Sequence, residues 1–107
     1  MRAVPTTKDI IQNIGKIFEK GLQNEYLSRS IGKIVEYEKE KTIKEVNMLK
    51  KELSRFESTY QMSSENFFSE FEKGDLGDEE DYFEWSAMYQ MYERSVDRLN
   101  ILESPSV

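Results

Sequence analysis

Proline occurs only at Pro5 and Pro105, so no residue between them is excluded from a helix interior by a proline ring. Because proline lacks an amide hydrogen and clashes with the preceding helical turn, its placement at the two ends leaves the chain between them free to be helical. Apolar residues then recur three and four residues apart along most of this stretch, which places them on one face of an α-helix. We therefore expect an all-α protein, and the apolar pattern requires no sheet.

The first apolar stripe predicts an amphipathic N-terminal helix over residues 7–21. Thr6 or Thr7 can cap its start, and Gly21 can end or bend it. This helix can fold back onto the rest of the chain, or it can bind another protein or a second copy. Its stripe consists of Ile10, Ile14, Ile17, Phe18 and Leu22.

Two longer stretches carry seams with the three-four spacing of a coiled coil, and they predict helices over 30–60 and 78–103. About 30 residues at about 1.5 Å each give roughly 45 Å, which is long for a chain of this size and predicts an elongated molecule. The simplest packing is an antiparallel helical hairpin. The seams are Val46, Leu49, Leu53, Phe56 and Tyr60 in the first helix, and Tyr82, Trp85, Tyr89, Tyr92, Val96 and Leu99 in the second.

A short helix over 64–73 is expected to interrupt this hairpin. Ser63 or Ser64 can cap its start, and Gly74 follows it at a position that favours positive φ. Asp78 is then expected to cap the last helix. The phenyl rings of this short helix would fill the open end of the hairpin, and we treat residues 1–107 as one domain.

The composition excludes many kinds of chemistry. The 107 residues include 0 Cys and 0 His, which removes disulfides, thiol nucleophiles, imidazole bases and the usual zinc and haem ligands. Carboxylate, lysine and hydroxyl groups remain, but they need a concave pocket that a small helical chain rarely builds. We expect a protein that is not an enzyme and that has no catalytic residues, cofactor or metal.

Charge is distributed unevenly along the chain. Residues 1–56 carry 12 Lys/Arg and 8 Asp/Glu, whereas residues 57–107 carry 3 and 13, so the halves have net charges of +4 and -10. Such asymmetry favours attraction of a charged partner. The sequence has no membrane-spanning run and its start lacks signal-peptide features, so we expect a cytoplasmic protein without membrane contact.

An acidic cluster lies at the start of the last helix, and it is a candidate for metal binding, helix capping or attraction of a partner. A twelve-residue calcium loop requires glycine at its sixth position and glutamate at its twelfth, but counting from Asp75 these are Glu80 and Ser86. The cluster therefore favours helix capping or partner attraction. Its members are Asp75, Asp78, Glu79, Glu80, Asp81 and Glu84.

Aromatic residues follow the acidic cluster, and they are suited either to a core or to an interface. Tyr82, Phe83 and Trp85 point in different directions around a helix, so at least one of them should be exposed or meet a partner. The candidate partner-binding residues are Asp78, Glu79, Glu80, Asp81, Phe83, Glu84 and Trp85, together with Ile10, Ile14 and Ile17.

Residues 53–92 resemble a family of small acidic helical proteins of bacteria and archaea. The shared sequence pattern consists of a Tyr-x-Met-Ser-Ser helix end, a short Phe-rich helix, a Phe-Glu-x-Gly-x-Leu-Gly-Asp turn and an Asp-x-Phe-Glu-Trp helix start. This resemblance is to the TumA-like antitoxins of toxin–antitoxin pairs, and it implies neutralisation of a small toxin. The residues that carry it are Tyr60, Met62, Ser63, Ser64, Phe71, Glu72, Gly74, Leu76, Gly77, Asp78, Asp81, Phe83, Glu84 and Trp85.

Three functions therefore stay open at the level of sequence. The first is stoichiometric binding of a protein partner, in particular a small basic toxin neutralised by the acidic half. The second is a structural coiled-coil or assembly domain that binds itself, and we expect a homo-oligomer, such as a dimer. The third and weakest is nucleic-acid binding by the basic half, because no base-stacking aromatic residue is interleaved with Lys16, Lys20, Arg29 and Lys33.

Overall fold

The computed structural model describes residues 3–105, which form four helices and no strand. The helices are α1 (Thr7–Glu19), α2 (Glu25–Tyr60), α3 (Ser64–Glu72) and α4 (Glu80–Glu103). The all-α prediction is therefore confirmed. The chain divides into two compact units, one up to Ile34 and one from Val35 onward, so the boundary between them lies inside α2. No described helix is both long enough and apolar enough to span a bilayer.

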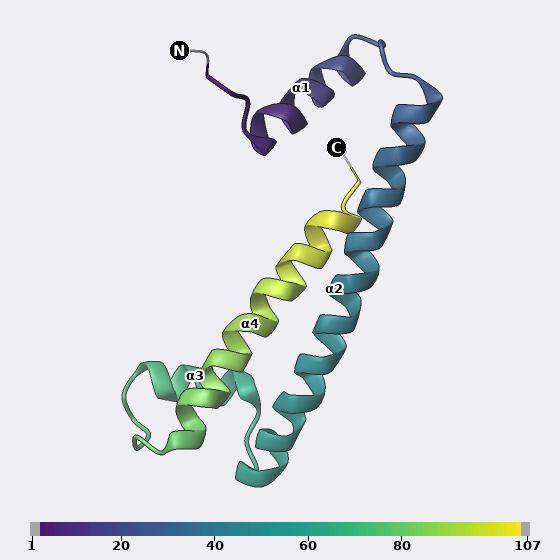
Figure 1. Cartoon of the computed structure of the whole chain (residues 1–107). Helices are drawn as coiled ribbons and strands as arrows, with labels where there is room; N and C mark the ends of the chain where they lie inside the picture. Colours follow the sequence, from purple (N-terminus) through teal and green to yellow (C-terminus); the bar gives the residue numbers. More distant parts are fainter. Residues whose placement is uncertain (1–2, 106–107) are drawn as a thin grey trace. The chain divides into compact units, whose positions relative to one another are not determined.

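The second unit is the predicted antiparallel hairpin, in which α4 runs beside α2 and α3 packs at the closed end (Figure 1). Near one end, the Arg98 guanidinium donates to the Glu38 carboxylate at 2.6 Å. Near the other end, the Tyr60 hydroxyl donates to the Asp81 carboxylate at 2.7 Å. Because the order of the partners is reversed along the two helices, these contacts fix their antiparallel pairing.

The core of the second unit lies where α2, α3 and α4 meet. Leu53, Phe67 and Trp85 form its buried centre, and Val46 and Leu49 extend the buried seam along α2 as predicted. Partly buried aromatic and aliphatic side chains surround this centre, so most apolar burial is concentrated at the α3 end. These are Phe56, Tyr60, Met62, Phe68, Phe71, Leu76, Tyr82, Met88, Tyr89 and Tyr92.

Farther from α3, small polar side chains occupy the hairpin interior. Thr42 on α2 and Ser95 on α4 are both buried, and the Thr42 hydroxyl donates to the Glu38 carbonyl at 2.7 Å. Val96 of the predicted α4 seam is half-buried, like Tyr92 and Leu99 of the same seam. The burial of the adjacent Ser95 was not predicted. A hydroxyl that bonds to its own helix is a tolerable core group, whereas an unpaired one is not.

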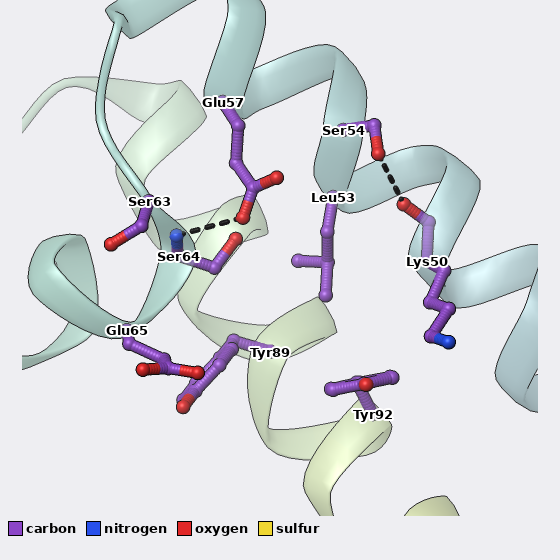
Figure 2. A pocket seen from close by; sticks show the side chains of 9 residues that line it. All are labelled: Lys50, Leu53, Ser54, Glu57, Ser63, Ser64, Glu65, Tyr89 and Tyr92. Atoms are coloured by element: carbon purple, nitrogen blue, oxygen red, sulfur yellow. Dashed lines mark hydrogen bonds between the residues drawn. The ribbon is translucent and has the colours of Figure 1, made fainter.

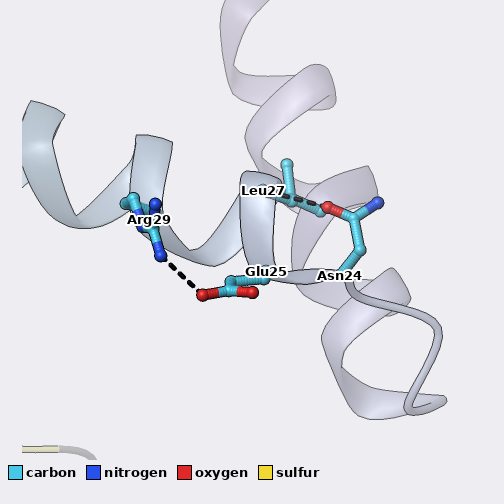
Figure 3. A network of polar contacts seen from close by, with 4 residues as sticks. All are labelled: Asn24, Glu25, Leu27 and Arg29. Carbon is cyan, nitrogen blue, oxygen red and sulfur yellow. Dashed lines mark hydrogen bonds and ion pairs between the residues drawn. The ribbon is translucent and has the colours of Figure 1, made fainter.

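Two helix starts differ from the sequence prediction. α2 begins at Glu25 and not at residue 30, because the Asn24 side-chain oxygen accepts a hydrogen bond from the Leu27 amide at 2.8 Å (Figure 3). The next turn is supported by an Arg29–Glu25 ion pair of 2.5 Å, which the same figure shows. Asp78 does not cap α4, so that prediction was wrong. The N-cap is Glu79, whose side chain makes no capping hydrogen bond.

Left-handed backbone positions end the first three helices. Gly21 (φ 69°) follows α1, and Gly74 (φ 77°) follows α3, which confirms the expectation for both glycines. Gln61 (φ 53°) takes the same conformation after α2, and the sequence did not reveal it. The helix end there is held by a hydrogen bond from the Met62 amide to the Glu57 carbonyl and by the Gln61 side-chain amide, which donates to the Ser58 carbonyl. These bonds compensate for the cost of a side chain at positive φ.

In the first unit, α1 begins with a reciprocal cap between Thr6 and Asp9. The Asp9 amide donates to the Thr6 hydroxyl at 3.1 Å, and the Thr6 amide donates to the Asp9 carboxylate at 2.9 Å. These hydrogen bonds to its ionised form lower the pKa of Asp9. The helix therefore starts where the sequence predicted, but none of its residues is buried.

We predict that Leu53→Ala will lower the free energy of unfolding by about 3 kcal/mol, because it removes buried methyl groups and leaves a cavity. Leu53 is only 4% exposed. Met48→Ala is the matched control on the same helix, since Met48 is 59% exposed, and it should change stability by about 0.5 kcal/mol or less. Urea unfolding followed by circular dichroism measures both. Equal stability of the two variants would contradict the hairpin core.

Candidate protein-binding site

Trp85 is a structural residue and not a surface contact. Its indole ring is fully buried and stacks on Phe67 with ring centroids 3.9 Å apart and an interplanar angle of 5°. Phe56 and Tyr60 of α2 lie against the same ring system, each with centroids 5.6 Å away. The sequence assigned Trp85 to the partner-binding set, and this assignment was wrong, because no partner can reach a side chain enclosed by α2 and α3.

The polar edge of Trp85 is held by Ser64. The indole N–H donates to the Ser64 hydroxyl at 2.8 Å, and the Ser64 amide donates to the Glu57 carboxylate at 2.8 Å, a contact shown in Figure 2. The hydroxyl of Ser63 caps α3 by accepting from the Asn66 amide at 3.1 Å. The two serines that the sequence treated as alternative caps therefore have separate roles.

An open hollow of about 320 Å³ adjoins these groups. Burial raises the pKa of the Tyr89 phenol at its wall, and the nearby carboxylates of Glu93 and Glu65 raise it further. The Glu57 carboxylate at this wall accepts the Ser64 amide, so it helps to hold the start of α3 in place. Its lining residues are Lys50, Leu53, Ser54, Glu57, Ser63, Ser64, Glu65, Tyr89 and Tyr92 (Figure 2).

Asp81 also serves the fold. Its carboxylate accepts the hydrogen bond from the Tyr60 hydroxyl, and this contact ties the end of α2 to the first turn of α4. The hydrogen bond stabilises the protonated phenol, and it raises the pKa of Tyr60 to about 12 together with desolvation and the charges of Asp81 and Glu79. Asp81 is therefore less available to a partner than its exposed neighbours in the acidic cluster.

Phe83 is the one aromatic side chain of the early α4 segment that faces solvent. It is 58% exposed, and its ring forms a T-shaped pair with Phe71, with 5.5 Å between centroids and an interplanar angle of 87°. Glu80 and Glu84 lie three residues before and one residue after it on the same helix, and both are exposed. The first two turns of α4 thus combine an exposed phenyl ring with carboxylates, and Asp78 and Glu79 precede them in the loop.

A second hollow, of about 190 Å³, lies between α2 and α4 close to this segment. Glu52, Asp81 and Glu84 line it together with Phe56. Arg55 lines it as well, and its guanidinium pairs with the Glu52 carboxylate at 2.9 Å. The sequence did not reveal this hollow, because Glu52 and Glu84 are far apart in the chain and only the antiparallel pairing brings them together.

The remaining predicted site residues lie elsewhere. Ile10, Ile14 and Ile17 all belong to α1 in the first unit, with Ile10 49% exposed and the other two half-buried. The candidate residues therefore form two separate surfaces, one on α1 and one on early α4. Within residues 3–105, no group of three or more acidic side chains is arranged to hold a metal ion. Comparisons of the chain with protein-family models, curated proteins and solved structures found no match.

We predict a loss of stability in alkali that depends on Tyr60. Since the folded pKa of about 12 lies above the ordinary value of 10.0, the unfolded chain releases this proton first. The contribution of the Tyr60 phenol to the free energy of unfolding is complete below pH 10 and is lost as the pH rises toward 12. Tyr60→Phe should flatten this loss and remove one late-titrating phenol from the ultraviolet titration. The exposed Tyr37→Phe control should leave both unchanged, and identical behaviour of the two variants would contradict the Tyr60–Asp81 contact.

Proposed function

We propose that this chain is a non-catalytic protein-binding module whose acidic second unit binds a basic protein partner in a stoichiometric complex. The observation that carries the proposal is the exposed phenyl ring of Phe83 among the carboxylates of Glu79, Glu80 and Glu84. An aromatic side chain in a strongly charged surface is typical of an interface anchor, because charge guides the encounter and apolar burial then retains the partner.

The charge of the second unit supports a basic partner. Residues 35–105 carry 9 Lys/Arg and 18 Asp/Glu, a net charge of -9. A surface potential of this sign attracts a positively charged protein and repels nucleic acid. The proposal therefore favours a protein over a phosphate backbone as the ligand of this unit.

The smaller hollow offers a place for one basic side chain of the partner. Glu52, Asp81 and Glu84 line it. The Glu52 carboxylate pairs with Arg55 and the Asp81 carboxylate accepts from Tyr60, whereas Glu84 is left for a partner. A guanidinium from a partner can pair with Glu84 and lie against the Phe56 ring, an arrangement that combines charge and cation–π attraction. Such a contact would fix the orientation of the bound partner, which electrostatic attraction alone does not do.

The resemblance to TumA-like antitoxins makes this partner a small basic toxin in our proposal. Several residues that carry the resemblance have structural roles here, including Ser63 in capping, Ser64 and Trp85 in the core, and Gly74 at a left-handed turn. Phe83 and Glu84 carry it at the surface. We propose that the resemblance extends to the binding surface that Phe83 and Glu84 form.

Neutralising the acidic surface should slow the association with the partner. The variant Glu79→Gln, Glu80→Gln, Glu84→Gln omits Asp81, because Asp81 has a role in the fold. With a small basic protein as the partner, stopped-flow measurements should show slower association and a weaker salt dependence, since charge mainly sets the encounter rate. The control variant Glu36→Gln, Glu40→Gln, Glu103→Gln removes equal charge elsewhere on the second unit. Equal effects of the two variants on the association rate would mean that only the net charge matters, and this result would contradict a specific role of the acidic surface.

Removing the exposed ring should instead speed dissociation. Phe83→Ala is expected to weaken binding by about 2 kcal/mol, mainly through the dissociation rate, as anchor residues at interfaces do. Ile101→Ala is the matched control, since Ile101 is 68% exposed on the same helix and lies far from the acidic cluster. Surface plasmon resonance separates the two rates. Unchanged dissociation of the Phe83 variant would remove this ring from the proposed interface.

A further inference from the structure

A third hollow, of about 290 Å³, lies between α2 and α4, and its lining residues all belong to the second unit. Four of them are on α4, where their spacing of three and four residues places them on one face of the helix. The volume is close to the lower limit for small-molecule sites, about 300 Å³. The lining residues are Glu45 of α2 and Met91, Arg94, Ser95 and Arg98 of α4.

The hydroxyl of Ser95 is an unpartnered polar group at the wall of this hollow. Ser95 is only 6% exposed, yet within residues 3–105 its hydroxyl forms no hydrogen bond to another protein group. Thr42, which is also buried between the helices, differs because it donates to the Glu38 carbonyl. No fully enclosed side-chain atom in this part of the chain lacks a partner, so the Ser95 oxygen is reached from the hollow. A buried hydroxyl normally has a hydrogen-bond partner, and here the hollow is where one can bind.

Opposite charges line the same hollow without neutralising each other. The Arg98 guanidinium pairs with the Glu38 carboxylate at 2.6 Å. Neither Arg94 nor Glu45 forms an ion pair in the part of the chain that the structure describes. A guanidinium from α4 and a carboxylate from α2 are therefore both available to one bound molecule.

We propose that this hollow binds a small zwitterion of the α-amino acid class. The carboxylate of the ligand accepts hydrogen bonds from the Arg94 guanidinium and the Ser95 hydroxyl, and its ammonium group pairs with the Glu45 carboxylate. Met91, which is 40% exposed, provides an apolar wall for the ligand side chain. The site is separate from the acidic surface around Phe83, so it goes beyond the proposed function.

The charges favour a zwitterion over a simple anion or cation. A simple anion on Arg94 would leave the Glu45 carboxylate unpaired beside it, and a simple cation on Glu45 would leave the Arg94 guanidinium unpaired. The second unit also has a net charge of -9, which repels an anion but not a ligand whose net charge is zero. Both charges of the ligand therefore contribute to binding.

Titration of the isotopically labelled full chain with L-alanine, followed by NMR, tests this proposal. We expect saturable shifts of the backbone amides of residues 91–98 and of those around Glu45. Propionate lacks the ammonium group and alaninamide lacks the carboxylate, so each should bind at least about ten-fold more weakly, since each loses a charge-assisted contact. Absence of saturable shifts with L-alanine, equal binding of propionate, or shifts centred on the acidic surface would overturn the proposal.

Variants of the lining residues test the individual contacts. Ser95→Ala should weaken L-alanine binding about ten-fold without lowering thermal stability, because the hydroxyl binds the ligand and no protein group. Glu45→Gln should weaken it as well, whereas the matched control Glu40→Gln should not, since Glu40 is exposed on the same helix outside the hollow. Unchanged binding by Ser95→Ala, or equal binding by the two glutamine variants, would overturn the proposal. Neither result bears on the binding of a basic partner around Phe83.

Discussion

The buried indole of Trp85 is the contact on which the second unit depends. Its ring stacks on Phe67 of α3 and lies against Phe56 and Tyr60 of α2, and its N–H is satisfied by Ser64. A buried tryptophan without an acceptor would leave a costly unpaired donor, so the serine is as necessary as the aromatic rings. Through this one side chain, a helix of nine residues joins two much longer ones.

The all-α class and the buried seam on α2 could be predicted from the sequence, because spacing alone decides which face of a long helix is apolar. The start of α2 and the turn at Gln61 could not. The first depends on one asparagine cap, and the second on a residue other than glycine whose backbone takes the left-handed conformation. The burial of Ser95 depends on interhelical packing, which a hydropathy pattern does not contain.

The candidate site was only partly predictable for a related reason. The sequence identified Phe83 as the aromatic residue outside the seam, and the structure places it at the surface. It also grouped Asp81 with the other acidic residues, although a hydrogen bond from a tyrosine 21 positions earlier gives Asp81 a structural role. Linear charge patterns do not distinguish a carboxylate that accepts an internal hydrogen bond from one that is free to meet a partner.

The position of Trp85 also has a consequence for the order in which this fold assembles. The partners of its indole lie between Phe56 and Phe67, so they close short loops, whereas the Arg98–Glu38 pair joins residues 60 positions apart. Short loops lose less entropy on closure and form sooner. We therefore expect a folding nucleus around α3 and the adjoining ends of α2 and α4. Pairing of α2 with α4 then extends from this nucleus toward the far ends of the two helices.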